Sequence, residues 1–276
     1  MTLRPSSIGS FINCPYQWYN VFILGKNTIP GARAHLGTAI HKSAEVLWSD
    51  AINTGVKDLN ISRATDAAVE ELHEICKQQP PEYGDDKPEE IEKLAVEGAK
   101  AFINDLAPII DIPLAVEKRY TIEIDNPIID KISGSLDYVG ERSIHDIKTT
   151  KNKPVMSNYS LQQGAYALLR EGNGEQIDNI KIQAVVLKDA TAKKQSEAHG
   201  LLMDMIEDNT NPFLSLESIK EQSRYVINNI LDTVNVYSKD IVRPEILFRG
   251  NPKSMLCSNK YCNLYAECPF VKGNLI

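Results

Sequence analysis

The sequence predicts a mixed α/β fold in which helices flank a central β-sheet. Three observations support this fold class: helical periodicity dominates before Pro113, alternating strand patterns begin at Leu114, and further helices follow the strands. The expected strands span 114–124, 128–139, 143–149 and 180–187, and the expected later helices span 159–170 and 215–236.

The composition is that of an ordinary water-soluble globular chain. The 276 residues are 42% hydrophobic and 24% charged, and no apolar run approaches the roughly 20 residues that a membrane span needs. Because the N-terminus also lacks an apolar signal segment, we expect a cytoplasmic protein without membrane contact. The net charge of −7 argues against a protein that coats nucleic acid, but it is compatible with an enzyme whose metal-binding acids act on DNA locally.

The N-terminal third is predicted to be helical. Residues 3–25 indicate two short helical pieces, with Pro15 restarting the chain after Cys14, which by itself resembles a small buried hydrophobic residue. Residues 37–48 indicate a helix capped at Thr38, with His41 on one side of it. A lone histidine in such a position is usually structural or exposed, so His41 alone does not indicate a metal site.

Two amphipathic helices, 61–78 and 88–107, complete this helical region. Their glutamate-rich faces are typical of solvated surface, and Pro108 and Pro113 end the block.

The stretch from Ser133 to Thr150 carries the strongest catalytic signal. It indicates two strands joined by a turn at 140–142, so that Asp146 and Lys148 share a face and Asp137 lies on the partner strand. Two close carboxylates repel unless a cation lies between them, and a hard divalent ion suits oxygen ligands. Lys148 can then orient a water or stabilise charge on a phosphate. The competing interpretation is that both acids are turn-flanking surface residues and Lys148 is their solvated partner.

Two neighbouring residues are secondary in this hypothesis. Glu117, in the first strand, can aim at the same cleft, although Lys118 and Arg119 beside it equally allow a surface ion pair. His145 should face away from Asp146, which argues against a role as a ligand.

The helix at 159–170 follows the catalytic hairpin directly. Gln162 and Tyr166 are four residues apart and share a face, where an amide and a phenol suit hydrogen bonds to phosphate or water. The alternative is that Tyr166 packs in the core and Gln162 is exposed. The polar stretch at 188–197 is expected to be a loop able to touch a nucleic-acid backbone.

Five cysteines and no secretion signal make a disulfide framework unexpected. Cys257, Cys262 and Cys268 lie close together in the sequence and indicate metal ligation, which for an iron–sulfur cubane or a structural zinc requires a fourth thiolate. Cys14 is better placed than Cys76 because it starts a loop–helix junction, whereas Cys76 lies inside an amphipathic helix. Such a site would join the two ends of the chain.

Taken in order, these residues resemble the RecB-type branch of the PD-(D/E)xK nucleases. The iron–sulfur members of that branch include the AddB nuclease domain, the CRISPR-associated adaptation exonucleases and phage relatives. The residues that carry the resemblance are His41, Asp137, Asp146, Ile147, Lys148, Gln162 and Tyr166, flanked by Cys14, Cys257, Cys262 and Cys268.

The resemblance implies a restriction-endonuclease-like core within a single domain, 1–276. It implies a helical region at 26–112, a catalytic core at 113–190, and a cluster-binding region formed by 1–25 with 250–276. His41, Asp137, Asp146 and the carbonyl of Ile147 would hold Mg²⁺ or Mn²⁺, and Lys148 would act on the attacking water. Gln162 and Tyr166 would contact the substrate or order the cleft. The four cysteines would hold a [4Fe–4S] cluster as a structural clasp, with zinc as the alternative.

The function implied is a metal-dependent DNA exonuclease that hydrolyses phosphodiester bonds at single-stranded or frayed ends with low sequence specificity. Expected partners are DNA and proteins of recombination, repair or integration. The alternatives are a catalytically silent DNA-binding or scaffold module of the same fold, and a structure-dependent endonuclease.

Overall fold

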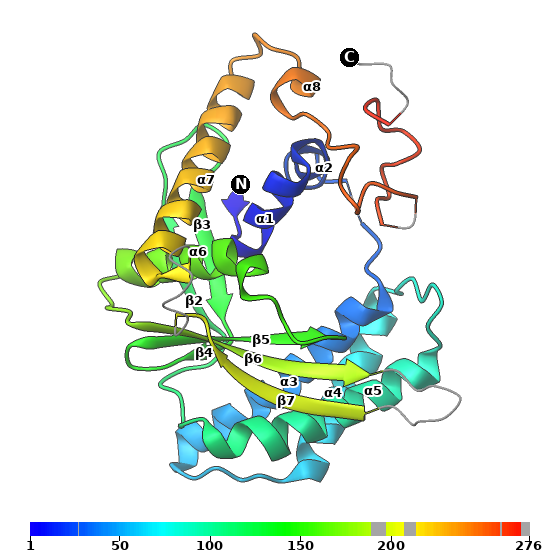
Figure 1. The fold of residues 1–276 in the computed structure, drawn as a ribbon, viewed down its shortest axis with the longest axis vertical. Helices are drawn as coiled ribbons and strands as arrows, with labels where there is room; N and C mark the ends of the chain where they lie inside the picture. Colours follow the sequence, from blue (N-terminus) through cyan, green and yellow to red (C-terminus); the bar gives the residue numbers. More distant parts are fainter. Residues whose placement is uncertain (27, 189–196, 207–213, 260, 272–276) are drawn as a thin grey trace.

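A sheet of strand order β4-β5-β6-β7 separates two helical layers in the computed structural model (Figure 1). The structure describes residues 1–26, 28–188, 197–206, 214–259 and 261–271. The strands are β1 (Thr2–Leu3), β2 (Lys118–Glu123), β3 (Lys131–Leu136), β4 (Tyr138–Val139), β5 (Ser143–Thr150), β6 (Asn179–Lys188) and β7 (Glu197–Asp204). The α-helices are α1 (Pro5–Asn13), α2 (Pro15–Trp18), α3 (Ala32–Thr54), α4 (Ile61–Gln78), α5 (Pro88–Ala101), α6 (Ser160–Gly172), α7 (Leu216–Tyr237) and α8 (Pro244–Leu247).

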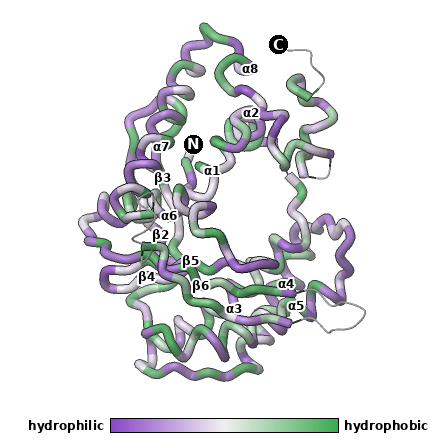
Figure 2. Tube along the Cα trace, in the orientation of Figure 1, coloured by the Kyte–Doolittle hydropathy of each residue, from purple (hydrophilic) through white to green (hydrophobic). Residues whose placement is uncertain are grey.

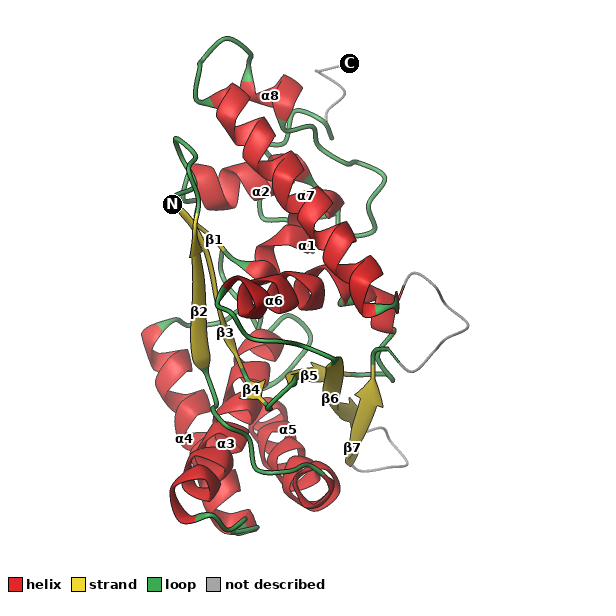
Figure 3. Ribbon diagram, turned by 90° about the vertical axis from the view of Figure 1, so that its left-hand side faces the viewer, coloured by secondary structure: helices red, strands yellow, loops and turns green. Residues whose placement is uncertain are grey.

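The strand pairing is mixed in direction. Within the sheet, β5 runs parallel to β6, whereas the pairs β4–β5 and β6–β7 are antiparallel. A second sheet has the order β1-β3-β2, and Figure 3 shows its strands running in a different direction from those of the first sheet. The predicted mixed α/β architecture is confirmed.

Both faces of the β4–β7 sheet are covered by apolar side chains. Along β6, Ile180, Ile182 and Val186 belong to one buried cluster, whereas the intervening Val185 and Leu187 belong to another. The first cluster includes residues of α1, α6 and α7, and the second includes residues of α3, α4 and α5. Because both faces are covered, β6 is buried from Ile182 to Leu187 and apolar without interruption from Ala184 to Leu187. The outer helix α7 instead alternates between hydrophilic and hydrophobic residues (Figure 2).

Most predicted helices are present, and one begins earlier than predicted. Helix α3 starts at Ala32 and not near Thr38, whose hydroxyl donates to the Ala34 carbonyl within the helix at 3.3 Å. The Ala-Arg-Ala-His-Leu stretch before Thr38 is made of residues that a helix accepts, and the N-cap residue is Gly31. Among the described residues, no helix is long and apolar enough to cross a membrane.

Strands β5 and β6 match the predicted 143–149 and 180–187 to within one residue at each end, whereas the other two predicted strands are shorter than their patterns for local reasons. Strand β2 begins only at Lys118 because Glu117 adopts a left-handed backbone conformation with φ 48°. The predicted strand 128–139 is interrupted at Asp137, so that β3 and β4 belong to different sheets. Strand β7 was not predicted. Of the loop expected at 188–197, residues 189–196 lie outside the described residues.

Aromatic side chains join the N-terminal helices to the C-terminal third. The Tyr19 ring stacks on Phe248 with centroids 4.6 Å apart, and its hydroxyl lies 3.2 Å from that of Tyr237. Tyr16 meets Phe270 edge-on at 5.2 Å. These contacts bring the segment containing Cys14 beside the C-terminal cysteines.

Candidate active site and cysteine pocket

Strand β5 presents a buried acid and a lysine on the same face. Asp146 is 4% exposed, and its Oδ2 lies 2.8 Å from the Lys148 ammonium, as the strand alternation predicts. Lys148 also donates to Gln162 Oε1 on α6 at 3.1 Å, and Gln162 Nε2 lies 3.5 Å from the Tyr166 hydroxyl. The ammonium is thus held between a carboxylate and an amide.

Asp137 reaches β5 from the break between the two sheets. Its Oδ2 accepts a hydrogen bond from the Ile147 N–H at 2.7 Å, and its Oδ1 lies 3.4 Å from His41 Nδ1. His41 comes from α3, in the helical layer on the other side of the sheet. The break at Asp137 therefore allows one carboxylate to face both β5 and α3.

Among the described residues, one group of ligand atoms is close enough to hold a metal ion. The imidazole of His41 and the carboxylates of Glu117 and Asp137 offer atoms that all lie within 4.8 Å of one another. Glu117 is the residue with φ 48°, a conformation that costs a non-glycine residue on the order of 1–2 kcal/mol. Such strain persists where the surrounding structure imposes it, and often does so at functional sites.

The charges of the site perturb its carboxyl groups and its imidazole. Burial opposes charge on Asp137, but the His41 imidazolium and the Ile147 N–H hold the pKa of Asp137 below its ordinary value. Burial raises the pKa of Asp146, with Lys148 opposing and Asp137 adding to the rise. Burial, followed by the Asp137 charge, likewise raises the pKa of Glu117.

His41 is a second cation of the site, beside the Lys148 ammonium. Burial alone would lower the pKa of His41, but the Asp137 carboxylate raises it to about 9. The metal-free arrangement therefore places a proton where a divalent ion would bind, and the three acids are chemically suited to oxygen ligation of Mg²⁺ or Mn²⁺.

The comparisons with known proteins bear on this arrangement. The sequence profile of the PD-(D/E)XK nuclease superfamily matches residues 2–269. The chain belongs to this superfamily. A solved structure from Eubacterium rectale, named "Putative exonuclease", is similar to this chain with 13% sequence identity and a TM-score of 0.47. The match covers 82% of this chain and 80% of the other chain. No curated protein matches the sequence.

The sequence predicted the acid–x–lysine element at Asp146-Ile147-Lys148 and the preceding acid at Asp137. The structure brings them together with His41, Gln162 and Tyr166. His145 faces away, as expected: it stacks on Tyr138 at 4.0 Å and contacts Gln183 at 3.0 Å. Burial and the Lys181 charge lower the pKa of His145 to about 3.

Two residues of this neighbourhood were not singled out from the sequence. Tyr159 lies beside the site, with the Lys148 ammonium 5.4 Å from its ring centroid. Arg170 is 1% exposed and donates to the carbonyls of the β4–β5 turn. Its position four residues after Tyr166, on the same helix face, was the available signal.

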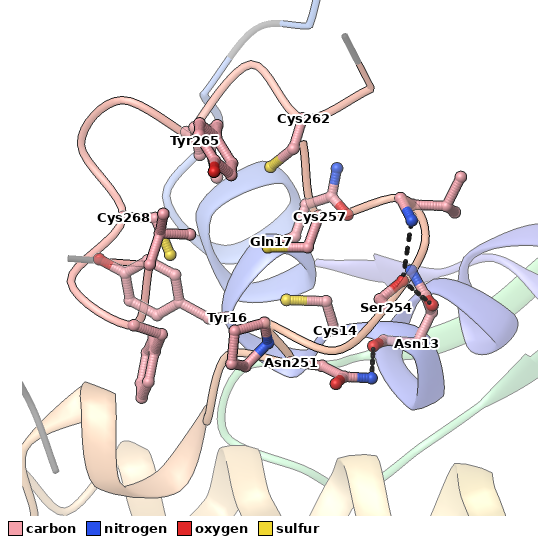
Figure 4. A pocket seen from close by; sticks show the side chains of 15 residues that line it. Asn13, Cys14, Tyr16, Gln17, Asn251, Ser254, Cys257, Cys262, Tyr265 and Cys268 are labelled. Carbon is pink, nitrogen blue, oxygen red and sulfur yellow. Dashed lines mark hydrogen bonds between the residues drawn. The ribbon is translucent and has the colours of Figure 1, made fainter. Parts of the chain in front are cut away.

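The four cysteines of the predicted cluster line one pocket, which Figure 4 shows between the α1–α2 junction and the C-terminal segment. The pocket contains about 410 Å³ of space, including solvent at its mouth. Cys76 does not line it. No three of the described cysteine sulfurs lie within 4.8 Å of one another.

Hydrogen bonds close the same junction. Asn251 Nδ2 donates to the Asn13 carbonyl at 3.0 Å, and the Ser254 hydroxyl donates to Asn13 Oδ1 at 2.8 Å. Both bonds are drawn in Figure 4. They hold the C-terminal segment against the end of α1.

Proposed function

We propose that this protein is a metal-dependent deoxyribonuclease of the RecB-type branch that hydrolyses phosphodiester bonds at single-stranded or frayed DNA ends. The observation that carries the proposal is the convergence of His41, Glu117 and Asp137 beside the Asp146–Lys148 ion pair. A purely structural ion pair does not require a third carboxylate on a strained backbone. The net charge of −7 is consistent with local handling of DNA.

His41, Asp137 and Asp146 would hold Mg²⁺ or Mn²⁺, with the Ile147 carbonyl as a further ligand, and Glu117 joins them on the distances observed here. When bound, the ion supplies a Lewis acid that stabilises charge on the scissile phosphate and makes water more acidic.

The protein's own groups fix the geometry for hydrolysis. Lys148 is restrained by Asp146 and Gln162, so its ammonium can donate a hydrogen bond to the attacking water or to a phosphate oxygen without reorganising. The Ile147 N–H fixes the Asp137 carboxylate. Tyr166 supports Gln162 from the next turn of α6.

Cleavage of end-labelled single- and double-stranded DNA with Mg²⁺ or Mn²⁺ tests this function. We expect Lys148→Ala and Asp146→Ala each to lower kcat by roughly 10²–10³-fold, the loss typical of removing one preorganised charge-stabilising group. Arg142→Ala, at an exposed position on the hairpin turn, is the matched control and should cleave like the wild type. Equal cleavage by all variants would indicate a contaminant and refute the active-site assignment.

We also propose that Cys14, Cys257, Cys262 and Cys268 bind a [4Fe–4S] cluster. The support is that all four line one pocket and that their thiols interact, since burial and then the neighbouring Cys268, Cys262 and Cys14 raise the pKa of Cys257. A single zinc ion would draw its sulfurs to about 3.8 Å from one another, given Zn–S bonds of about 2.3 Å. A cubane would hold the same four thiolates further apart, on its periphery.

Anaerobic purification tests the cluster independently of nuclease activity. We expect a brown protein with iron and acid-labile sulfide, and loss of the colour in Cys14→Ala or Cys262→Ala. Cys76→Ala is the matched control and should stay brown, because Cys76 lies outside the pocket. A colourless protein containing stoichiometric zinc would refute the iron–sulfur assignment.

A further inference from the structure

The segment between β5 and α6, residues 151–159, connects the strand of Lys148 to the helix of Gln162. It carries the exposed lysines Lys151 and Lys153, and an apolar side chain, Val155, that is 60% exposed. Lysines that follow a backbone, together with apolar or aromatic side chains that meet bases, are what single-strand-binding grooves combine. The chemistry of this segment is therefore suited to an unpaired strand.

Tyr159 ends this segment at the N-terminus of α6. Its ring centroid lies 5.4 Å from the Lys148 ammonium, within cation–π range. The side chain is half-buried and packs against the core, so part of the ring remains in solvent while its position is fixed. Burial raises the pKa of Tyr159, with Lys148 lowering it and Asp146 raising it, which places the phenol near both catalytic groups and keeps it neutral.

We propose that Tyr159 is a nucleobase platform, on which the base adjacent to the phosphate at Lys148 stacks. This inference rests on the proposed nuclease function and adds a substrate requirement to it. A base can lie on the ring only if it is unpaired and unstacked, so the platform favours single-stranded or frayed ends. Every base has a π-face, so stacking of this kind is tolerant of sequence.

A double-mutant cycle that combines substitution of Tyr159 with removal of a single base from the DNA tests the proposal. Binding of fluorescein-labelled single-stranded oligonucleotides is measured by anisotropy in Ca²⁺, with wild type and Tyr159→Leu. The oligonucleotides are intact or carry one abasic nucleotide, placed in turn at each position near either end. Leucine retains apolar packing against the core but removes the aromatic face.

With the intact strand, Tyr159→Leu should bind about 5- to 150-fold more weakly, the range expected for loss of one stacked base. At one abasic position the affinity of the wild type should fall by a similar factor. For that same oligonucleotide, Tyr159→Leu should bind only slightly more weakly than the wild type, because the two changes remove the same contact. Tyr159→Phe should bind like the wild type. Tyr225→Leu, changing a tyrosine that is 73% exposed on α7, is the matched control.

If the losses of affinity caused by Tyr159→Leu and by base removal were additive at every abasic position, or if Tyr159→Leu bound the intact strand like the wild type, the proposed stacking on Tyr159 would be refuted. A structural role for Tyr159 would lower the thermal midpoint and weaken binding equally to intact and abasic strands. Failure of the nuclease proposal is seen separately, as absence of wild-type cleavage in Mg²⁺ or Mn²⁺ while the binding cycle still reports on stacking.

Discussion

Replacing Arg170 should show how the hairpin of β4 and β5 is held in place. The guanidinium of Arg170 donates to the carbonyls of Gly140 at 3.1 Å, Ser143 at 2.8 Å and Glu141 at 3.3 Å, and it pairs with Glu175 at 2.7 Å. Gly140 and Glu141 lie in the turn between β4 and β5, and Ser143 is the first residue of β5. Arg170 therefore ties α6, which carries Gln162, to the hairpin between Asp137 and Asp146.

The substitution Arg170→Met retains an unbranched apolar chain in place of the arginine stem and removes every one of these bonds. Because Arg170 is 1% exposed, its loss leaves carbonyls without a charged donor inside the fold. Removing one partner of a fully buried ion pair typically costs about 3–5 kcal/mol. The Glu175 side chain is 29% exposed, so we expect the free energy of unfolding to decrease by up to about 3 kcal/mol. Glu175 retains bonds from Lys118 and Tyr120, which favours the lower end of the range.

Urea unfolding followed by circular dichroism measures this change. The matched control is Arg142→Met, on the same turn, whose ion pair with Asp178 joins side chains that are 49% and 51% exposed. An exposed pair contributes about 0–1 kcal/mol, so the control should unfold almost like the wild type. If the two variants lost equal stability, or if Arg170→Met lost less than about 1 kcal/mol, the argument for Arg170 would be refuted.

Three further predictions concern the site and its support. Since Mn²⁺ must displace the His41 proton, the affinity of the protein for Mn²⁺, measured by calorimetry, should rise by up to about tenfold per pH unit until about pH 9. In His41→Gln the Mn²⁺ affinity should depend less on pH. With metal removed by a chelator, the free energy of unfolding should instead decrease as the pH rises. The contribution of the His41–Asp137 pair is complete below pH 6.5, the ordinary pKa of histidine, and is lost as the pH rises through about 9, the pKa of His41 in the folded protein. Glu117→Gly should raise metal-free stability by on the order of 1 kcal/mol, by relieving the positive φ, while weakening Mn²⁺ binding; loss of both would contradict the strain argument. Gly164→Ala should lower the free energy of unfolding by about 1–3 kcal/mol, because its Cβ would clash with the Ile219 backbone carbonyl. Gly9→Ala is the control, because a Cβ there meets open space, and it should not destabilise the protein.

The sequence was sufficient where local pattern and function coincide. Alternation along β5 predicted that Asp146 and Lys148 share a face, and a spacing of four predicted that Gln162 and Tyr166 meet. Helix periodicity likewise gave the bounds of α4 within the chain. Each of these inferences depends on residues a few positions apart, where the backbone period determines direction.

The sequence was insufficient where tertiary contacts override the pattern. The apolar alternation of 128–139 gave no sign that the strand changes sheets at Asp137. No residue pattern around Glu117 predicts its positive φ, which is rare for glutamate. The start of α3 was missed because Thr38 is a good N-cap that here lies inside the helix.

The two backbone irregularities meet at one place, and this convergence has a physical reason. A regular strand at Asp137 would direct successive side chains to opposite faces, and it could not offer one carboxylate to both the Ile147 N–H and the His41 imidazole. A regular strand at Glu117 would likewise fix its side chain by alternation alone. Glu117 directly precedes β2 and Asp137 directly follows β3, and these interruptions bring the two carboxylates to the histidine of α3, at the cost of strain and charge repulsion. A divalent cation would remove the repulsion and would take the strained glutamate as a ligand, so the irregular backbone supports the metal site that we propose.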